Sequence, residues 1–360
     1  MGAPRCAHPI PRDRKANFHV IAFAIRRILV GIVLLLAMVL VVFVLFFAAG
    51  NPARDVCGKY CTPQKLANIT QVYGYDKPIT YQFGQFVKGL AVGRDYPVDD
   101  KYREALQKSN PSLVIHCDAP CLGYSLRSAI TVNDAIAKYA PVTISIAVYA
   151  FIIWIVFGVL FGVIAAVFKG KWLDRVIVGV TLVVYALPTF FVGTFLLQFI
   201  AIRWKLFPYP RYVSIADGGV FNWLIGLTLP AMTLALFYMA AYVRITRAFV
   251  LESLSEDYIR TARAKGLTER VVLFKHGLRA ALTPLLSMAG LDFAALLAGA
   301  VITEAVFSYQ GLGLLAVISN RNSDLPILIG LVIVAGAAVL AANIIVDILY
   351  AFVDPRVRLS

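Results

Sequence analysis

Six long apolar runs most constrain what this chain can fold into. About 20 apolar residues are enough for a helix to cross a bilayer, and each run has at least that length. The runs cover residues 28–50, 141–168, 176–202, 220–243, 282–307 and 326–352. Only 15% of the chain is charged, against ~25% in soluble domains. The sequence therefore predicts an all-α integral membrane protein with six transmembrane helices.

The first run follows Arg26 and Arg27, so a signal peptide is the alternative to a span. A signal peptide has an apolar core of only ~7–15 residues, followed by a small-residue cleavage site. The run over 28–50 is longer and stays uncharged throughout. We therefore interpret residues 1–27 as a tail and 28–50 as the first span.

The distribution of basic residues predicts which side each connection faces. The tail 1–27, the turn 169–175, the segment 244–279 and the end of the chain together hold 19 Lys and Arg, whereas the two short connections on the opposite side hold 4. Basic residues gather on the cytoplasmic side, and long loops are discounted in this rule. Both termini are therefore predicted to be cytoplasmic, with an external loop at 51–139, a core at 140–353 and a tail at 354–360. Because the basic residues behave as topology signals, the net charge of +14 predicts contact with membrane lipid and not with nucleic acid.

The external loop at 51–139 is the only extended polar part of the chain. Within it, residues 79–90 place apolar side chains on one helical face, which predicts an amphipathic helix at the membrane surface. Four cysteines lie in this loop: Cys57, Cys61, Cys117 and Cys121. In an oxidising compartment such a set predicts disulfides, with three connectivities open. A zinc site would favour a reducing compartment, and the spacing of three residues within each pair differs from the two of thioredoxin-type motifs.

A charged segment separates the fourth and fifth runs, and its pattern predicts a short helix over 255–266. Ser255 is the expected N-cap, since a serine side chain satisfies free amides at a helix start. Acidic residues follow in the first turn, where the helix dipole favours them. Gly266 stands where a left-handed residue ends a helix. Tyr258, Ile259 and Ala262 share one face, which we interpret as an apolar edge offered to the groove of a partner.

Four polar residues lie within or near the last two runs: Asp292, Glu304, Asn343 and Asp347. Ionisable groups are costly in lipid and are functional candidates by default. Two interpretations remain open, contact with a transported molecule or polar contacts between helices. Asn343 and Asp347, one turn apart, fit a polar seam between helices.

Several ordered motifs resemble one family of transport proteins. DYIRTARAKGL at 257–267 and HGLRAALTP at 276–284 resemble the "EAA" cytoplasmic loop of bacterial ABC importer permeases. EAVFSYQGLG at 304–313 and DILYAFVDPR at 347–356 match the first permease subunit type of the dipeptide/oligopeptide/nickel family. Two features depart from the family pattern. Thr261, Ala262 and Arg263 occupy the positions that name the motif, and the external loop has an added segment near 99–120.

This resemblance implies a type I importer permease that binds no nucleotide and catalyses no reaction itself. A second homologous permease subunit would complete the pore as a heterodimer, two ATPase subunits would bind ATP and Mg, and an external solute-binding protein would deliver the solute. The segment over 255–266 would be the coupling helix that fits a groove of an ATPase. The residues implied in coupling are Glu256, Asp257, Tyr258, Thr261, Ala262, Arg263 and Gly266.

The resemblance also implies a multi-pass protein of the bacterial inner membrane that transports peptides, with a metal chelate, haem or a sugar as the alternative solutes. No Gly-rich phosphate-binding loop is present in the sequence. The resemblance implies no cofactor and no metal in this chain. Two other classes of membrane protein fit the sequence less well. An intramembrane aspartyl protease would use Asp292 and Asp347, but its surrounding motifs are absent. A secondary transporter would show an internal repeat, and none is evident.

Overall fold

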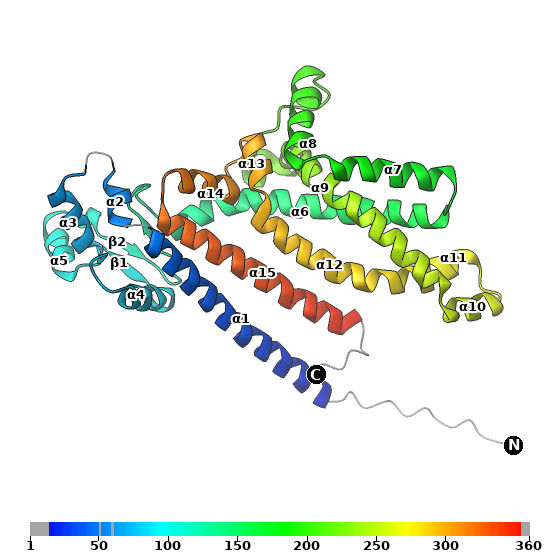
Figure 1. Cartoon of the computed structure of the whole chain (residues 1–360), viewed down its shortest axis with the longest axis horizontal. Helices are drawn as coiled ribbons and strands as arrows, with labels where there is room; N and C mark the ends of the chain where they lie inside the picture. Colours follow the sequence, from blue (N-terminus) through cyan, green and yellow to red (C-terminus); the bar gives the residue numbers. More distant parts are fainter. Residues whose placement is uncertain (1–13, 50–51, 59–60, 354–360) are drawn as a thin grey trace.

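Helices dominate the computed structural model, which describes residues 14–49, 52–58 and 61–353. Most of the long helices run between two ends of the molecule (Figure 1). One end, here named the α2–α5 end, carries a small segment of short helices and strands. The other, the α10 end, carries the turn between α6 and α7 together with α10 and α11 (Glu269–Val271). A mostly helical membrane protein was predicted, and this is confirmed.

Four helices are long and apolar enough to cross a membrane singly. They are α1 (Arg14–Ala49), α6 (Val132–Val167), α9 (Ile215–Ser255) and α15 (Leu325–Val353). Each covers one of the predicted runs to within one residue, although α1 begins well before residue 28 and Gly50 lies outside the described residues. Pro141 and Pro230 are accommodated inside α6 and α9. These four runs are therefore helical as predicted.

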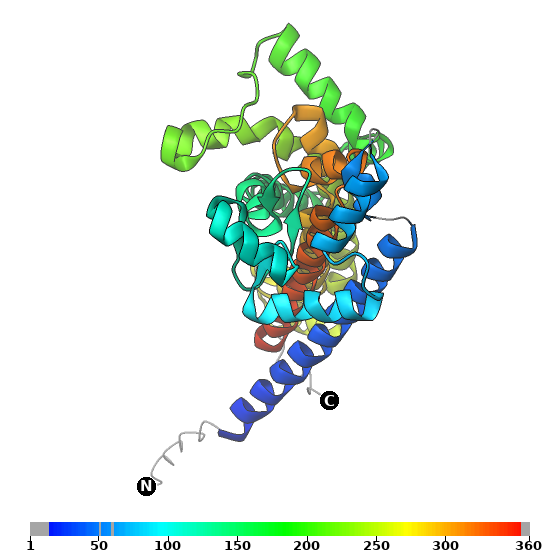
Figure 2. The ribbon, with the colours of Figure 1, turned by 90° about the vertical axis from the view of Figure 1, so that its left-hand side faces the viewer.

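The predicted third span is not one helix. It divides into α7 (Trp172–Ala186) and α8 (Thr189–Phe195), and α8 continues as the π-helix η2 (Leu196–Arg203). The two parts meet at 100°, so α8 and η2 project from the side of the bundle (Figure 2). Leu187 is extended at the break. Pro188 supplies no amide hydrogen and disfavours helical geometry in the residue before it, which explains the break.

The predicted fifth span also bends, by 53° between α12 (Leu278–Gly299) and α13 (Val301–Phe307). A short apolar helix follows, α14 (Leu312–Arg321), which the sequence analysis did not predict. It packs against α13 and α15. Only ten residues long, α14 lies below the length at which an apolar run signals a span.

The core of the bundle is the contact between α6 and α9. Trp154 of α6 is fully buried and stacks on Tyr238 of α9 with ring centroids 4.5 Å apart. Two glycines of α6 lie one turn apart along the same contact. A Cβ at Gly158 would lie 2.9 Å from the Cβ of Tyr242, and one at Gly162 would lie 2.5 Å from the Cβ of Thr246. Glycine at both positions therefore permits the two helices to approach closely.

The α2–α5 end is built from short elements. Its helices are α2 (Pro52–Cys57), α3 (Pro63–Val72), α4 (Ile79–Val92), α5 (Asp100–Ser109) and the turn η1 (Pro111–Leu113). Two antiparallel strand pairs accompany them, β1 (Arg94–Tyr96) with β2 (Ile115–Cys117), and β3 (Tyr124–Ser125) with β4 (Ile130–Thr131). The predicted helix over 79–90 is present as α4. Its apolar face packs on α1 and α15 through Phe83, Phe86 and Leu90.

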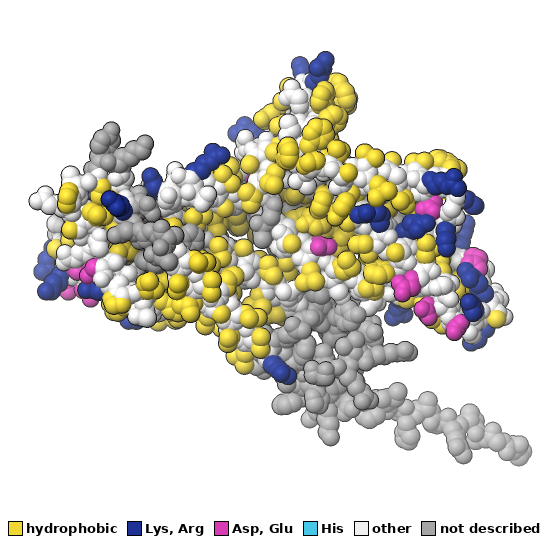
Figure 3. All heavy atoms as spheres, viewed as in Figure 1, with side chains coloured by type: hydrophobic (Ala, Val, Ile, Leu, Met, Phe, Trp, Pro, Cys, Tyr) yellow, Lys and Arg dark blue, Asp and Glu magenta, His cyan; other side chains and the backbone are white. Residues whose placement is uncertain are grey.

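Charged side chains concentrate at the two ends of the molecule. Figure 3 shows a mainly hydrophobic band between them, with blue and magenta side chains gathered over the α10 end. Apolar side chains such as Val33, Leu45 and Val183 remain more than 60% exposed on the bundle. In water this exposure would be costly, whereas a bilayer covers it.

Candidate functional site

The charged segment folds into the short helix α10 (Asp257–Ala264) at one end of the bundle. Its N-cap is Glu256, with extended backbone angles. The prediction of Ser255 as N-cap is wrong, because α9 continues through Ser255, whose Oγ donates to the carbonyl of Glu252 at 2.6 Å. The long helix α9 therefore passes into α10 across a single extended residue.

The end of α10 follows the prediction. Gly266 has a φ of +75°, in the left-handed region that glycine adopts without strain. Its amide donates to the carbonyl of Arg263 at 2.9 Å, and the amide of Leu267 donates to that of Ala262 at 3.3 Å. This hydrogen-bond pair is a Schellman motif. It ends the helix and turns the chain toward α11.

The apolar edge of α10 faces the chain itself and not a partner. Ile259 is 0% exposed and Ala262 is 6% exposed, and both pack with Val272 and Leu254. For these two residues the prediction of an edge offered to a partner's groove is therefore wrong, whereas Tyr258, the third residue of that edge, is 44% exposed. Periodicity identified the apolar face, but it carried no information on which surface covers that face.

Tyr258 anchors α10 through its hydroxyl, while its ring stays 44% exposed. The hydroxyl lies 2.7 Å from Oγ of Ser253 in α9, and Ser253 donates to the carbonyl of Gly277 at 3.0 Å. Gly277 ends the π-helix η3 (Val272–Gly277), which leads into α12. Three helices are thus joined at one buried hydroxyl. Ser253 carried no sequence signal, because its role depends on residues 24 positions away.

The outward face of α10 is polar and carries both signs of charge. Asp257 pairs with Arg260 at 3.3 Å, and Arg263 makes two contacts with Glu269, at 2.8 and 3.2 Å. Glu256 and Thr261 are exposed as well. Solvated pairs of this kind contribute only about 0–1 kcal/mol each. They shape a charged surface more than they stabilise the helix.

An ion pair fixes α9 to the start of α7 near the same end. Nε and one Nη of Arg247 donate to the two carboxylate oxygens of Asp174 at 2.7 and 2.8 Å. Asp174 is only 4% exposed and also accepts from the amide of Gly170 at 2.8 Å. Two-point pairing of this kind fixes the orientation of both side chains. The α6–α7 turn and α9 are therefore held together.

Glu304 lies at a junction of three helices. Its carboxylate is fully buried, accepts from Oγ1 of Thr143 in α6 at 2.6 Å and from the amide of Leu314 in α14 at 2.9 Å. Thr143 accepts in turn from the amide of Leu312 at 2.8 Å. A Cβ at Gly311 would meet the carboxylate at 2.4 Å. Of the two interpretations that remained open, these contacts favour the interhelical one for Glu304.

Asp292 and Asn343 are less enclosed than Glu304. Asp292 of α12 accepts from the hydroxyl of Tyr242 in α9 at 2.6 Å. The side-chain oxygen of Asn343 is buried with no hydrogen-bond partner among the described residues. Asp347 lies in α15, and its side chain is outside the described residues. The structure thus brings Asp292 to a tyrosine of the neighbouring helix.

The cysteines pair within each short motif. Cys57 bonds to Cys61 and Cys117 to Cys121, with Cα atoms 5.2 and 5.5 Å apart. Of the three connectivities, the structure selects this local one. Within the described ranges, no three His, Cys, Asp or Glu side chains converge to hold a metal ion.

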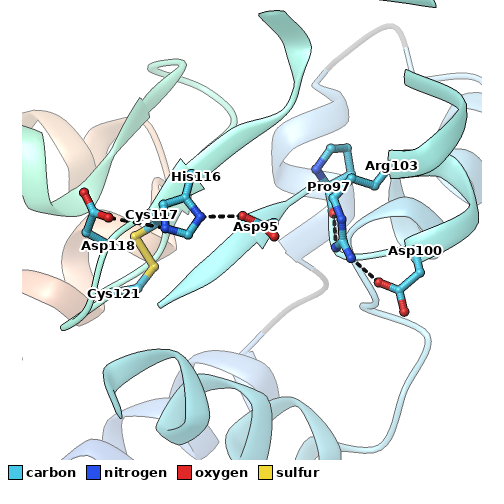
Figure 4. Close-up of polar contacts among 8 residues, drawn as sticks. All are labelled: Asp95, Pro97, Asp100, Arg103, His116, Cys117, Asp118 and Cys121. Carbon is cyan, nitrogen blue, oxygen red and sulfur yellow. Dashed lines mark hydrogen bonds and ion pairs between the residues drawn. A yellow bond between two sulfur atoms is a disulfide. The ribbon is translucent and has the colours of Figure 1, made fainter. Parts of the chain in front are cut away.

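A histidine cluster borders the second disulfide (Figure 4). His116 of β2 lies 2.6 Å from Asp95 of β1 through Nδ1, and 3.3 Å from Asp118 through Nε2. The hydrogen bond and charge of Asp95, with a smaller contribution from Asp118, raise the pKa of His116 above its usual value. The cluster therefore links the two strands most strongly when His116 is protonated.

Comparisons with known proteins agree with this architecture. Residues 158–359 match the family described as "Binding-protein-dependent transport system inner membrane component", and residues 20–147 match its N-terminal companion. A probable peptide ABC transporter permease of Sinorhizobium fredii is 34% identical, covering 93% of this chain and 98% of its own. The dipeptide transport system permease DppB of Escherichia coli is 32% identical, covering 86% and 90%.

A more distant likeness connects the chain to a solved amino acid ABC transporter. It covers 62% of this chain and 95% of the other, with 16% identity and a TM-score of 0.42, and we base no argument on it. The family match extends over more than half of the sequence and carries the assignment. The chain belongs to the binding-protein-dependent transport system inner membrane components, and is a multi-pass inner-membrane permease of an ABC importer.

Proposed function

We propose that this chain is one half of the pore of an ATP-driven importer of peptides. The relatives are peptide and dipeptide permeases that align over most of both chains, and they support this solute class. If each bent helix pair counts as one span, the chain crosses the membrane six times. With the charge asymmetry of the connections, both termini and α10 lie in the cytoplasm and the α2–α5 end lies outside.

The helix α10 is the coupling helix in this proposal. The observation that carries it is the division of α10 into a buried edge and a charged outward face. Glu256, Asp257, Thr261 and Arg263 form the outward face and would contact the ATPase. Ala262 and Tyr258 hold α10 on η3 and α9, and Gly266 ends α10 and fixes the direction in which the chain leaves it. A helix held in this way transmits the movement of a bound partner to α9 and α12 as a rigid body.

The partners follow from the same mechanism. A second, homologous permease subunit would complete the pore, and a solute-binding protein would dock at the α2–α5 end. Two ATPase subunits would bind ATP and Mg and hydrolyse the nucleotide, so this chain would need no cofactor of its own. We expect mild detergent to preserve the permease–ATPase complex, because the contact surface on α10 is preformed.

Substitution of Gly266 tests the coupling proposal. Valine at a φ of +75° is strained, and the left-handed region costs an ordinary residue about 1–2 kcal/mol. Gly266→Val should leave insertion intact and lower peptide uptake per ATP hydrolysed several-fold, measured in proteoliposomes containing the whole transporter. Gly58→Val is the matched control. Gly58 has the same φ of +75° and the same open space around its Cβ position, but lies at the opposite end.

Two results would count against the proposal. Normal uptake and normal substrate-stimulated ATPase activity in Gly266→Val would remove this residue from coupling. Equal losses in both glycine variants would indicate general strain instead. The solute class is tested separately: an excess of unlabelled tripeptide should compete with labelled peptide, and an excess of a sugar should not.

A further inference from the structure

A cavity of about 100 Å³ lies where the α2–α5 end meets the tips of α1 and α15. Its walls combine apolar side chains with a few polar groups, as the walls of small-molecule sites do. Phe43 of α1, Phe86 of α4 and Ile329 of α15 form its apolar part. Tyr81, 50% exposed, lies among the lining residues where the cavity opens to the surroundings.

The remaining wall contains five tyrosines and, among the described residues, a single charge. Among the described residues, Arg94 is the only charged side chain that lines the cavity. Its guanidinium lies 5.3 Å from the ring centre of Tyr96, and it forms no ion pair with a described carboxylate. An arginine with no partner among the described carboxylates, next to an apolar space, is suited to bind an anion.

The tyrosines of this wall add no negative charge. Burial, with smaller effects of Tyr124 and Tyr102, raises the pKa of Tyr73 to about 12. Burial also raises the pKa of Tyr96 and of Tyr124. The phenols therefore stay neutral at physiological pH, and the cavity offers a cation, neutral hydroxyls and an apolar floor.

The position of the cavity matches the boundary of the bilayer. Phe43 lies near the end of the apolar stretch of α1, and Leu325 and Pro326 begin that of α15. Tyrosines are enriched at this level, since their rings are apolar and their hydroxyls are hydrated. The cavity is also separate from the α6–α9 core, because none of its lining residues comes from either helix.

We propose that this cavity binds one phospholipid, with the phosphate at Arg94 and an acyl chain along Phe43, Phe86 and Ile329. A transported peptide fits less well, because its ammonium group needs a carboxylate and the lining residues supply none. A bound lipid would connect α4 to α1 and α15 and so fix the external segment on the membrane.

Lipid titration of the purified full-length chain tests this proposal. Native mass spectrometry in mild detergent would follow phosphatidylglycerol binding to the wild type, Arg94→Gln and Lys88→Gln. Lys88 is the matched control, since it is exposed on α4 outside the cavity and loses the same charge. A charge-assisted hydrogen bond contributes about 1.5–3 kcal/mol, so Arg94→Gln should weaken binding about tenfold or more. Lys88→Gln should not change it.

Two further variants separate lipid recognition from folding. Arg94→Lys keeps the charge and should retain most of the affinity. Ile329→Trp fills the apolar part and should weaken binding without any change of charge. An unchanged thermal transition verifies the fold of each variant. If Arg94→Gln does not keep the wild-type thermal transition, the lipid affinity of Ile329→Trp relative to that of the wild type tests the proposal instead.

Three other probes identify the source of the anion. Diacylglycerol with the same chains lacks the phosphate, inorganic phosphate lacks the chains, and a tripeptide carries a carboxylate. Each should bind the wild type at least about tenfold more weakly than phosphatidylglycerol, if each charge-assisted or apolar contribution is worth about 1.4 kcal/mol. Equal lipid binding by Arg94→Gln and Lys88→Gln, equal binding of diacylglycerol, or displacement of the lipid by the tripeptide would each overturn the proposal.

Discussion

The two ends of the bundle fix their surface segments in different ways. At the α10 end, a helix of eight residues is held by burial of Ile259 and by the hydroxyl contact between Tyr258 and Ser253. At the α2–α5 end, short elements are fixed by two disulfides that each span four positions, and by paired strands. Both ends pack on the long helices, the α2–α5 end through α4, but only the α2–α5 end adds local covalent and strand links of its own.

This difference has a mechanical consequence. Since α10 has no core of its own, it keeps its position only as long as α9 and η3 keep theirs. A force on α10 therefore reaches α9 directly and α12 through η3. The α2–α5 end keeps more of its shape independently, because its disulfides and the β1–β2 pair lie within it. We expect substitutions at the two ends to differ in how far their effects spread.

The largest effect is expected from Ile259→Asp. This change places a carboxylate at a position that is 0% exposed, where removal of water from an unpaired charge costs about 3 kcal/mol or more. The variant should have a lower midpoint of thermal unfolding, measured by differential scanning calorimetry. It should also abolish coupled peptide uptake, measured in proteoliposomes. Thr261→Asp, on the exposed face of the same helix, should shift stability by only about 0.5 kcal/mol or less.

Similar midpoints of thermal unfolding for Ile259→Asp and Thr261→Asp would contradict the proposed difference between the two ends. They would mean that α10 detaches without cost and that its buried edge does not hold it. Hydrogen exchange sharpens the test: in Ile259→Asp the loss of protection should extend into the ends of α9 and η3, while the β1–β2 amides keep theirs.

A smaller effect is expected from removal of the disulfides. For a bridge across four positions, loop-closure entropy gives a stabilisation of about 2 kcal/mol. Cys117 and Cys121 are also buried beside Tyr96 at 1% and 2% exposure. The double variant Cys117→Ser/Cys121→Ser should therefore lose more stability than the double variant Cys57→Ser/Cys61→Ser. Non-reducing thermal unfolding would rank the two. Loss of α10 protection in either variant would show that the ends are not independent.

Much of the fold could be predicted because the strongest signals are local. Apolar runs located the membrane helices, and Gly266 marked the end of α10. Both signals depend only on residues within the segment concerned. The break at Pro188 was underestimated: a proline inside an apolar run predicts either a tolerated kink, as at Pro230, or a bend of 100°. Whether a proline gives a small kink or a sharp bend depends on packing against other helices, which the residues of one apolar run do not determine.

The site was predicted less completely than the fold. The outward residues of α10 followed from its charges, whereas the direction of its apolar edge and the role of Ser253 depend on distant parts of the chain. The partners of Glu304 and Asp174 likewise come from 161 and 73 positions away. Disulfide connectivity also remained open in the sequence, because any two of the four cysteines could in principle form a bond.

The smallest effect, and the finest test of the local link at the α2–α5 end, concerns His116. Its folded pKa is raised by Asp95 and then Asp118, above an unfolded value of about 6.5. The contribution of His116 to the stability of the β1–β2 pair should thus be complete below about pH 6.5, and it should disappear as pH rises through the folded pKa. Protection factors of the β1–β2 amides should fall over that interval in the wild type and stay constant in His116→Gln. Because His116 is solvent-exposed, the change should remain within β1 and β2; a parallel fall at α10 would contradict the separation of the two ends.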